Sequence, residues 1–127
     1  MQSSLYLSPE PSNPPQNVTA TVISSNGIIV SWEEVPAINQ NGEITTYEIQ
    51  DVPLETFEGQ ISTNTVNTSN GSVLMMVLTG LQEYVEYNIS VRAYTRAGPG
   101  PYSDPVTERT NSDSKGKLDM ISKYEVV

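Results

Sequence analysis

The stretch YNISVRAYT, residues 87–95, alternates apolar and polar side chains at every position. One face carries Tyr87, Ile89, Val91 and Ala93, and the other carries Asn88, Ser90, Arg92 and Tyr94. Such period-two alternation is typical of a β-strand that packs one face against a core and turns the other toward solvent. We therefore expect a strand over residues 87–95 with its apolar face inward.

Six further strands are expected on either side of this one, separated by turn residues at the spacing of about 8–12 residues that all-β proteins show. They are residues 17–23, 28–35, 44–50, part of 59–66, 72–78 and 101–110. Helical periodicity is absent from most of the chain. Pro101 and Pro105 restrict the last strand to a sheet edge or require a bulge there. Seven short strands predict an all-β fold of two packed sheets.

The balance of charges excludes several classes of function. The chain has 127 residues, six basic and fifteen acidic side chains, a net charge of −9, no histidine and no cysteine. Without histidine or cysteine there is no imidazole or thiol catalysis, no usual zinc site and no disulfide. Residues 14–110 hold eleven acids and three arginines, a net charge of −8. We expect no binding to nucleic acid, whereas a basic protein partner fits this charge.

Composition divides the chain into three parts. Residues 1–13 run into the sequence PSNPP (residues 11–15) and read as an extended lead-in or linker, and residues 14–110 form the domain. Residues 111–127 hold all three lysines and are expected to be a flexible tail or linker, although Leu118, Ile121 and Tyr124 have a spacing that a short helix would also give. The longest apolar run, Val73–Leu78, is far shorter than the roughly twenty residues of a membrane span, so we expect no membrane insertion of this fragment.

Several spaced signals recur in one order over the domain: PP-x-NVTAT from Pro14, IIVSW ending at Trp32, NGEITTYEIQ over 41–50, and LTGLQEYVEYNISVRAYTRAGPGPYS over 78–103. With these signals, residues 14–110 closely resemble a fibronectin type III domain. The resemblance implies a seven-stranded antiparallel Greek-key β-sandwich of the immunoglobulin-like class. It also implies a structural core that includes Trp32, Tyr47, Leu81 and Tyr87.

The resemblance assigns roles to single residues as well. The Tyr87 hydroxyl is expected to bond a backbone group across a corner of the sandwich. Gly98 and Gly100 are expected to supply positive φ angles in the loop before the last strand. Asp51 stands two residues beyond Ile49, where the family usually has an aromatic residue, and Gln82-Glu83 replaces the common proline after Leu81.

Fibronectin type III modules bind proteins and space their neighbours in receptors and adhesion molecules. The resemblance therefore implies a non-catalytic, extracellular protein-binding and spacer module of a larger receptor or cell-adhesion-type protein, with neighbouring domains in the same chain. An alternative is an accessory module of a secreted carbohydrate-active enzyme. A third reading, a hydrolase, has only scattered carboxylates in its favour. The loop from Arg96 to Gly100 lacks the Arg-Gly-Asp tripeptide, so we expect no integrin binding by that route.

Two kinds of candidate site remain. Four Asn-x-Ser/Thr sequons offer glycosylation sites if the chain is secreted by a eukaryotic cell. They are Asn17, Asn67, Asn70 and Asn88. The stretch 72–78 is apolar on both faces, and its outward residues, joined by one from the second strand, would form an exposed apolar surface for protein contact. These residues are Ile29, Val73, Met75 and Val77.

The remaining charged residues are expected to be structural. Glu33 and Glu34 are adjacent on one strand and therefore point to opposite faces, so they cannot act on one substrate atom. With Glu43, Glu55 and Glu58, they predict a solvated acidic surface, and we expect no metal or cofactor. Arg92 and Tyr94 are expected to pair across strands with Glu48.

Overall fold

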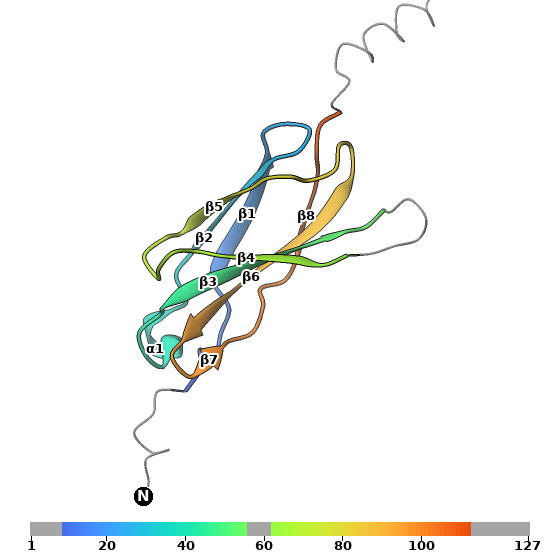
Figure 1. Ribbon diagram of the computed structural model, residues 1–127. Coiled ribbons are helices and arrows are strands. Elements are labelled where there is room, and N and C mark those ends of the chain that lie inside the picture. Colours follow the sequence, from blue (N-terminus) through green and yellow to red (C-terminus); the bar gives the residue numbers. More distant parts are fainter. Residues whose placement is uncertain (1–8, 56–61, 113–127) are drawn as a thin grey trace, which may run out of the picture.

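The computed structural model describes residues 9–55 and 62–112 as two antiparallel sheets stacked face to face (Figure 1). The smaller sheet has the order β1-β2-β5, with β1 at Gln16–Val22, β2 at Ile28–Glu33 and β5 at Met75–Leu78. The larger has the order β4-β3-β6, with β4 at Asn64–Asn67, β3 at Thr46–Pro53 and β6 at Glu86–Thr95. Two short strands, β7 at Gly98–Pro99 and β8 at Val106–Arg109, also pair with β6. The all-β antiparallel sandwich expected from the sequence is confirmed.

The core lies between β2 of one sheet and β3 and β6 of the other. β6 alternates between half-buried and buried residues along its whole length, with the tyrosine, isoleucine, valine and alanine of the pattern inward. The rings of Trp32 and Tyr47 face each other from opposite sheets, with their centroids 5.3 Å apart. Leu81 and Tyr87 are buried in the same cluster. Burial of this apolar area is the main force that holds the sheets together.

The extent predicted for the last strand, residues 101–110, is wrong. Pro101 and Pro105 have no N–H to donate, so the chain beside β6 forms only the pieces β7 and β8. Between them Ser103 restores two bonds to β6: its N–H donates to the Val91 carbonyl at 2.8 Å, and its hydroxyl accepts from the Val91 N–H at 3.0 Å. Gly98 and Pro99, expected in a turn, are already paired with β6.

Other boundaries also differ from those expected. β3 runs to Pro53 rather than ending at residue 50, and β5 begins at Met75 rather than at residue 72, so Val73 precedes the strand. A helical turn, α1 at Ala37–Gln40, lies in the loop after β2. No helix in the described ranges has the length and apolarity to cross a bilayer. Leu118, Ile121, Tyr124 and residues 59–61 of the weak strand lie outside the described residues.

The packed unit includes the end of the lead-in. Pro11 is fully buried, and the Thr95 hydroxyl donates to the Pro9 carbonyl at 3.0 Å. Gly98 has the expected positive φ of 136°, whereas Gly100 is required for a different reason. A Cβ at Gly100 would lie 2.7 Å from the Pro11 carbonyl oxygen, so the loop and the lead-in could not pack this closely with any other residue.

Candidate protein-contact surface

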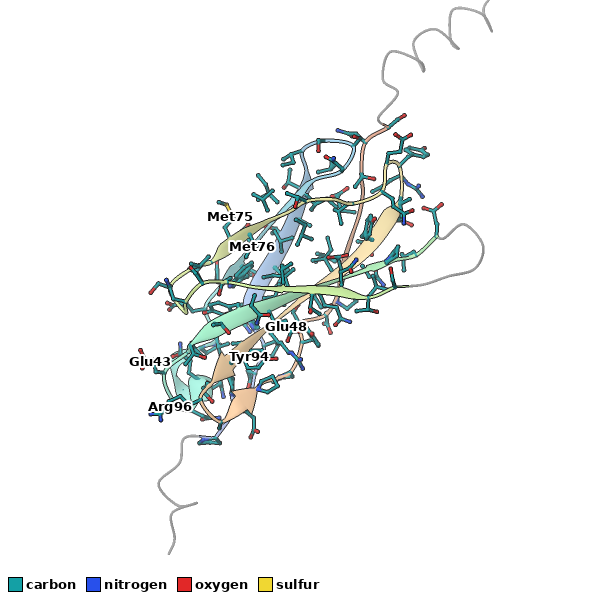
Figure 2. The ribbon with its side chains drawn as sticks, viewed as in Figure 1. Glu43, Glu48, Met75, Met76, Tyr94 and Arg96 are labelled. Atoms are coloured by element: carbon teal, nitrogen blue, oxygen red, sulfur yellow. The ribbon has the colours of Figure 1, made fainter. Side chains whose placement is uncertain are left out.

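Four apolar residues on and beside the edge strand β5 form the surface that we call the β5 strip: Ile29, Val73, Met75 and Val77. Val77 pairs with Ile29 on β2, and Met75 pairs with Ser31. Met75 is 53% exposed and Val77 41%, while Ile29 and Val73 are half-buried. Figure 2 shows Met75 and Met76 on this flank, away from Glu48 and Tyr94. Met76 packs against the core, so successive side chains of β5 lie on opposite faces of the sheet.

The central part of this outer face is uncharged. The outward positions paired there across the three strands are Thr19, Thr21, Ile29, Ser31, Met75 and Val77, while Glu33, the exposed last residue of β2, places one carboxylate at the end of the face. The hydroxyls of Thr19 and Ser31 hydrogen-bond each other at 2.9 Å, which satisfies polar groups on the β1 side. Because no charge has to be dehydrated at these six positions, covering them with another protein costs less than covering charged parts of the surface.

The outer face of the larger sheet is built differently, around Glu48. The carboxylate accepts from Arg92 Nε at 2.6 Å and from the Tyr94 hydroxyl at 2.8 Å. The Arg92 guanidinium also lies 4.4 Å from the centroid of the Tyr102 ring. Burial opposes ionisation of Glu48, but the hydrogen bonds from Arg92 and Tyr94 and the Arg92 charge outweigh it and lower its pKa below 4.5. The cross-strand pairing expected of these residues is present, and the group is satisfied internally.

The acidic residues do not converge on a reactive centre. Glu33 accepts from the Asn17 side-chain amide at 2.8 Å, whereas Glu34 lies with Glu43 beside Tyr47 in a separate cavity. Glu55 pairs with Arg109 at 2.8 Å, and Glu58 lies outside the described residues. Within residues 9–55 and 62–112, no three acidic, histidine or cysteine side chains gather closely enough to hold a metal ion.

The sequons differ in their surroundings. Asn67 and Asn70 are exposed at the end of β4 and in the turn that follows. Asn17 is exposed, but its amide is engaged by Glu33. Asn88 is half-buried on β6, between β3 and β8, and its Oδ1 accepts from the Thr107 hydroxyl at 2.7 Å.

The core tyrosines have unequal partners. The Tyr87 hydroxyl accepts from the Gln82 backbone N–H at 2.8 Å across the corner between β5 and β6. The Tyr47 hydroxyl, like Trp32 Nε1, is buried with no hydrogen-bond partner in the described part of the chain. Burial, reinforced by the negative charge of Glu34, raises the pKa of Tyr47 above 10.0.

Sequence reasoning missed the burial of Asp51. Its side chain is only 3% exposed and lines a cleft between β4 and β5. A signal for this was present, because Tyr47, Ile49 and Asp51 are two residues apart and therefore share the inward face of β3. The early end assumed for that strand hid the pattern.

Comparison with known proteins gives one family and several relatives. The family model described as fibronectin type III domain matches residues 13–109. Protein sidekick-1 of Gallus gallus is 40% identical over 107 residues, which are 84% of this chain and 5% of that protein. Receptor-type tyrosine-protein phosphatase F of Bos taurus is 39% identical over 81% of this chain and 5% of its own length. Cell adhesion molecule Dscam2 of Drosophila melanogaster is 36% identical over 81% of this chain and 5% of its own length. The chain thus spans about one twentieth of each.

A solved structure agrees with this assignment. The FN5 domain of Drosophila Lar superposes with a TM-score of 0.64 at 31% sequence identity, and the match covers 80% of this chain and 98% of that one. The match covers nearly the whole of that single domain, in contrast to the small share of the full-length relatives.

Proposed function

Because this chain belongs to the fibronectin type III family, we propose that it is a non-catalytic, extracellular module of a larger receptor or cell-adhesion-type protein. It binds a protein partner and spaces the neighbouring domains of its own chain. Its relatives include a receptor-type phosphatase and a cell adhesion molecule, each about twenty times longer than the matched segment. Similarity to these two relatives favours a module of a receptor or adhesion protein over an accessory module of a carbohydrate-active enzyme.

The observation that carries the binding role is the β5 strip. Met75 and Val77 are exposed side by side on an edge strand, and the outward positions that pair with them on β2 are the uncharged Ser31 and Ile29. An exposed apolar patch with a hydroxyl-bearing border is the pattern expected of a protein-contact surface. Methionine adds a flexible side chain that adapts to the shape of a partner.

The spacer role is supported by the path of the chain. The first described residues lie beside α1 and β7, and the last lie at the opposite end of the sandwich (Figure 1). At the first end the Asn41 side-chain amide donates a hydrogen bond to the Glu10 carbonyl. At the other end the Asn111 N–H donates to the Ser24 carbonyl. Neighbouring domains would therefore attach at opposite ends and leave both sheet faces accessible. The net charge of −9 makes a basic partner the electrostatic expectation.

The test displays the chain in its native flanks on animal cells and identifies nearby extracellular proteins by proximity labelling. Wild type is compared with the double variant Met75→Lys and Val77→Lys. The matched control is Ala37→Lys and Ile38→Lys, which makes the same change in net charge on the exposed helical turn α1, outside the β5 strip.

We expect wild type and the control to enrich the same proteins and the β5-strip variant to lose them. If all three label the same set, the β5 strip is not the contact surface. Thermal unfolding of each variant verifies that a lost partner does not reflect a lost fold.

A further inference from the structure

A cleft of about 350 Å³ opens between β5, an edge strand of the smaller sheet, and β4, an edge strand of the larger sheet. Asp51 on β3 lines it, and so does Val77 of the β5 strip. Asp51 is the one residue with a formal charge among those that line the cleft in the described part of the chain. The cleft therefore places a single carboxylate beside the proposed contact surface.

Asp51 has too few partners for a buried carboxylate. Its carboxylate has one hydrogen bond among the described residues, from the Asn64 side-chain amide to Oδ1 at 3.5 Å, which is longer than the usual range of about 2.7–3.2 Å. The arginines of the neighbouring strands form ion pairs with other carboxylates, Arg92 with Glu48 and Arg109 with Glu55. A buried carboxylate without a cation is unfavourable, and burial raises the pKa of Asp51 above 3.8. A cationic group entering the cleft would supply the missing partner.

The walls of the cleft indicate the shape of that group. The lining is mixed: Val77, Leu78 and Leu81 supply apolar surface, and hydroxyl and amide side chains such as those of Thr65, Thr79 and Gln82 supply polar groups. An arginine side chain suits such a mixed lining, because it combines an apolar stem with a planar guanidinium that can donate two parallel hydrogen bonds to one carboxylate. Guanidinium is also more weakly hydrated than ammonium and enters a partly buried site at lower cost.

We propose that the cleft between β4 and β5 binds an arginine side chain of the partner protein, with its guanidinium on Asp51. This rests on the proposed function and specifies the chemistry of the partner. Because Val77 belongs to both the cleft and the β5 strip, one partner surface can cover the strip and insert its arginine alongside. The occupied cleft would add a buried charged contact to the apolar contact of the β5 strip, and a few buried contacts of this kind supply most of the binding energy in many interfaces.

The test uses the ¹⁵N-labelled chain of 127 residues and two small probes. N-acetyl-arginine methylamide is titrated into the protein, and N-acetyl-citrulline methylamide serves as the uncharged probe of nearly the same shape. We expect saturable shifts of backbone amides that line the cleft, such as Asn64, Leu78 and Gly80, with arginine and not with citrulline. Equal shifts with both probes, or no saturable shift with arginine, would overturn the proposal.

Two variants complete the test. Asp51→Asn should weaken arginine binding by at least about tenfold, since it removes a charge-assisted hydrogen bond. Asp104→Asn makes the same change at an exposed loop position and should leave the binding unaltered. Unchanged binding by Asp51→Asn would also overturn the proposal. If that variant does not fold, the comparison of the arginine and citrulline probes on the wild-type chain tests the proposal. If arginine fails to bind while the β5-strip variant still loses its partner, the cleft assignment falls and the proposed function stands.

Discussion

Glu48 and Asp51 lie three residues apart on β3, and their surroundings move their pKa values in opposite directions. Glu48 points outward to Arg92 and Tyr94, which favour its charged form. Asp51 points inward, where desolvation favours its neutral form and the bond from Asn64 compensates only in part. The same chemical group is thus stabilising at one position and destabilising at the other, and pH separates the two effects.

Replacing Glu48 by glutamine should lower the free energy of unfolding at pH 7 by about 1–3 kcal/mol, because it leaves the half-buried Arg92 without its charged partner. The folded-state pKa of Glu48 is depressed, so its contribution is present above the unfolded value of 4.5 and is lost as pH falls through the folded value. Urea unfolding at pH 7 and at about pH 2 measures the difference. A gap between wild type and variant that persists unchanged in acid would contradict this account.

Replacing Asp51 by asparagine should have the reverse effect. Its folded-state pKa is raised, so the folded state is not penalised below the unfolded value of 3.8, and stability is lost as pH rises through the folded value. The variant should therefore unfold with a free energy higher by on the order of 1 kcal/mol at pH 7 and nearly equal at about pH 3. The same urea series measures it, and a variant less stable than wild type at pH 7 would show that the carboxylate is better partnered than the cleft geometry indicates.

At the level of elements, the sequence predicted best those strands whose alternation is long and uninterrupted. β6 was expected from residue 87 and begins at Glu86, and β2 begins at Ile28 as expected, because burial of every second residue leaves a pattern that few other structures produce. β4 carries no such pattern, since all four of its residues are exposed. α1 buries no residue and likewise gives no apolar signal. The start of β5 was misplaced because apolar residues continue on both sides of Met75.

The candidate site was predictable in part for a related reason. The β5 strip could be inferred because outward apolar residues stand out in an alternating pattern, and neighbouring strands bring Ile29 and Val77 together. The cleft could not, because it depends on how closely the edges of β4 and β5 approach each other, a long-range property that neither strand encodes by itself.

The turn that joins β4 to β5 depends on Gly71. A Cβ at this position would lie 1.9 Å from the Ile44 carbonyl oxygen, so Gly71→Ala must displace the backbone. Gly80 has a positive φ of 70° but open space around it, so Gly80→Ala carries only conformational strain of about 1 kcal/mol. We expect Gly71→Ala to lower the unfolding free energy by more than 2 kcal/mol, roughly the upper range of single substitutions. Thermal unfolding compares the two variants, and an equal or smaller loss at Gly71 would refute the close approach.

At the scale of the whole molecule, secretion tests the extracellular assignment. In chain secreted from animal cells, we expect glycans on Asn67 or Asn70, which are exposed at one end of the sandwich. Asn88 should stay unmodified because it lies half-buried within the larger sheet and is engaged by Thr107. Mass spectrometry with and without a glycosidase, on wild type and on Asn67→Gln with Asn70→Gln, measures this. A mass equal to that of the bare peptide in every sample would count against a secreted module.

The central claim is that this sandwich acts by protein contact through the β5 strip. The most direct measurement is the equilibrium affinity of a partner captured by proximity labelling for three proteins: wild type, Met75→Lys with Val77→Lys, and Ala37→Lys with Ile38→Lys. The β5-strip variant should bind at least about tenfold more weakly, as expected for charging the centre of an interface, and the control should bind with little change. Equal affinity of all three proteins for the partner would contradict the central claim.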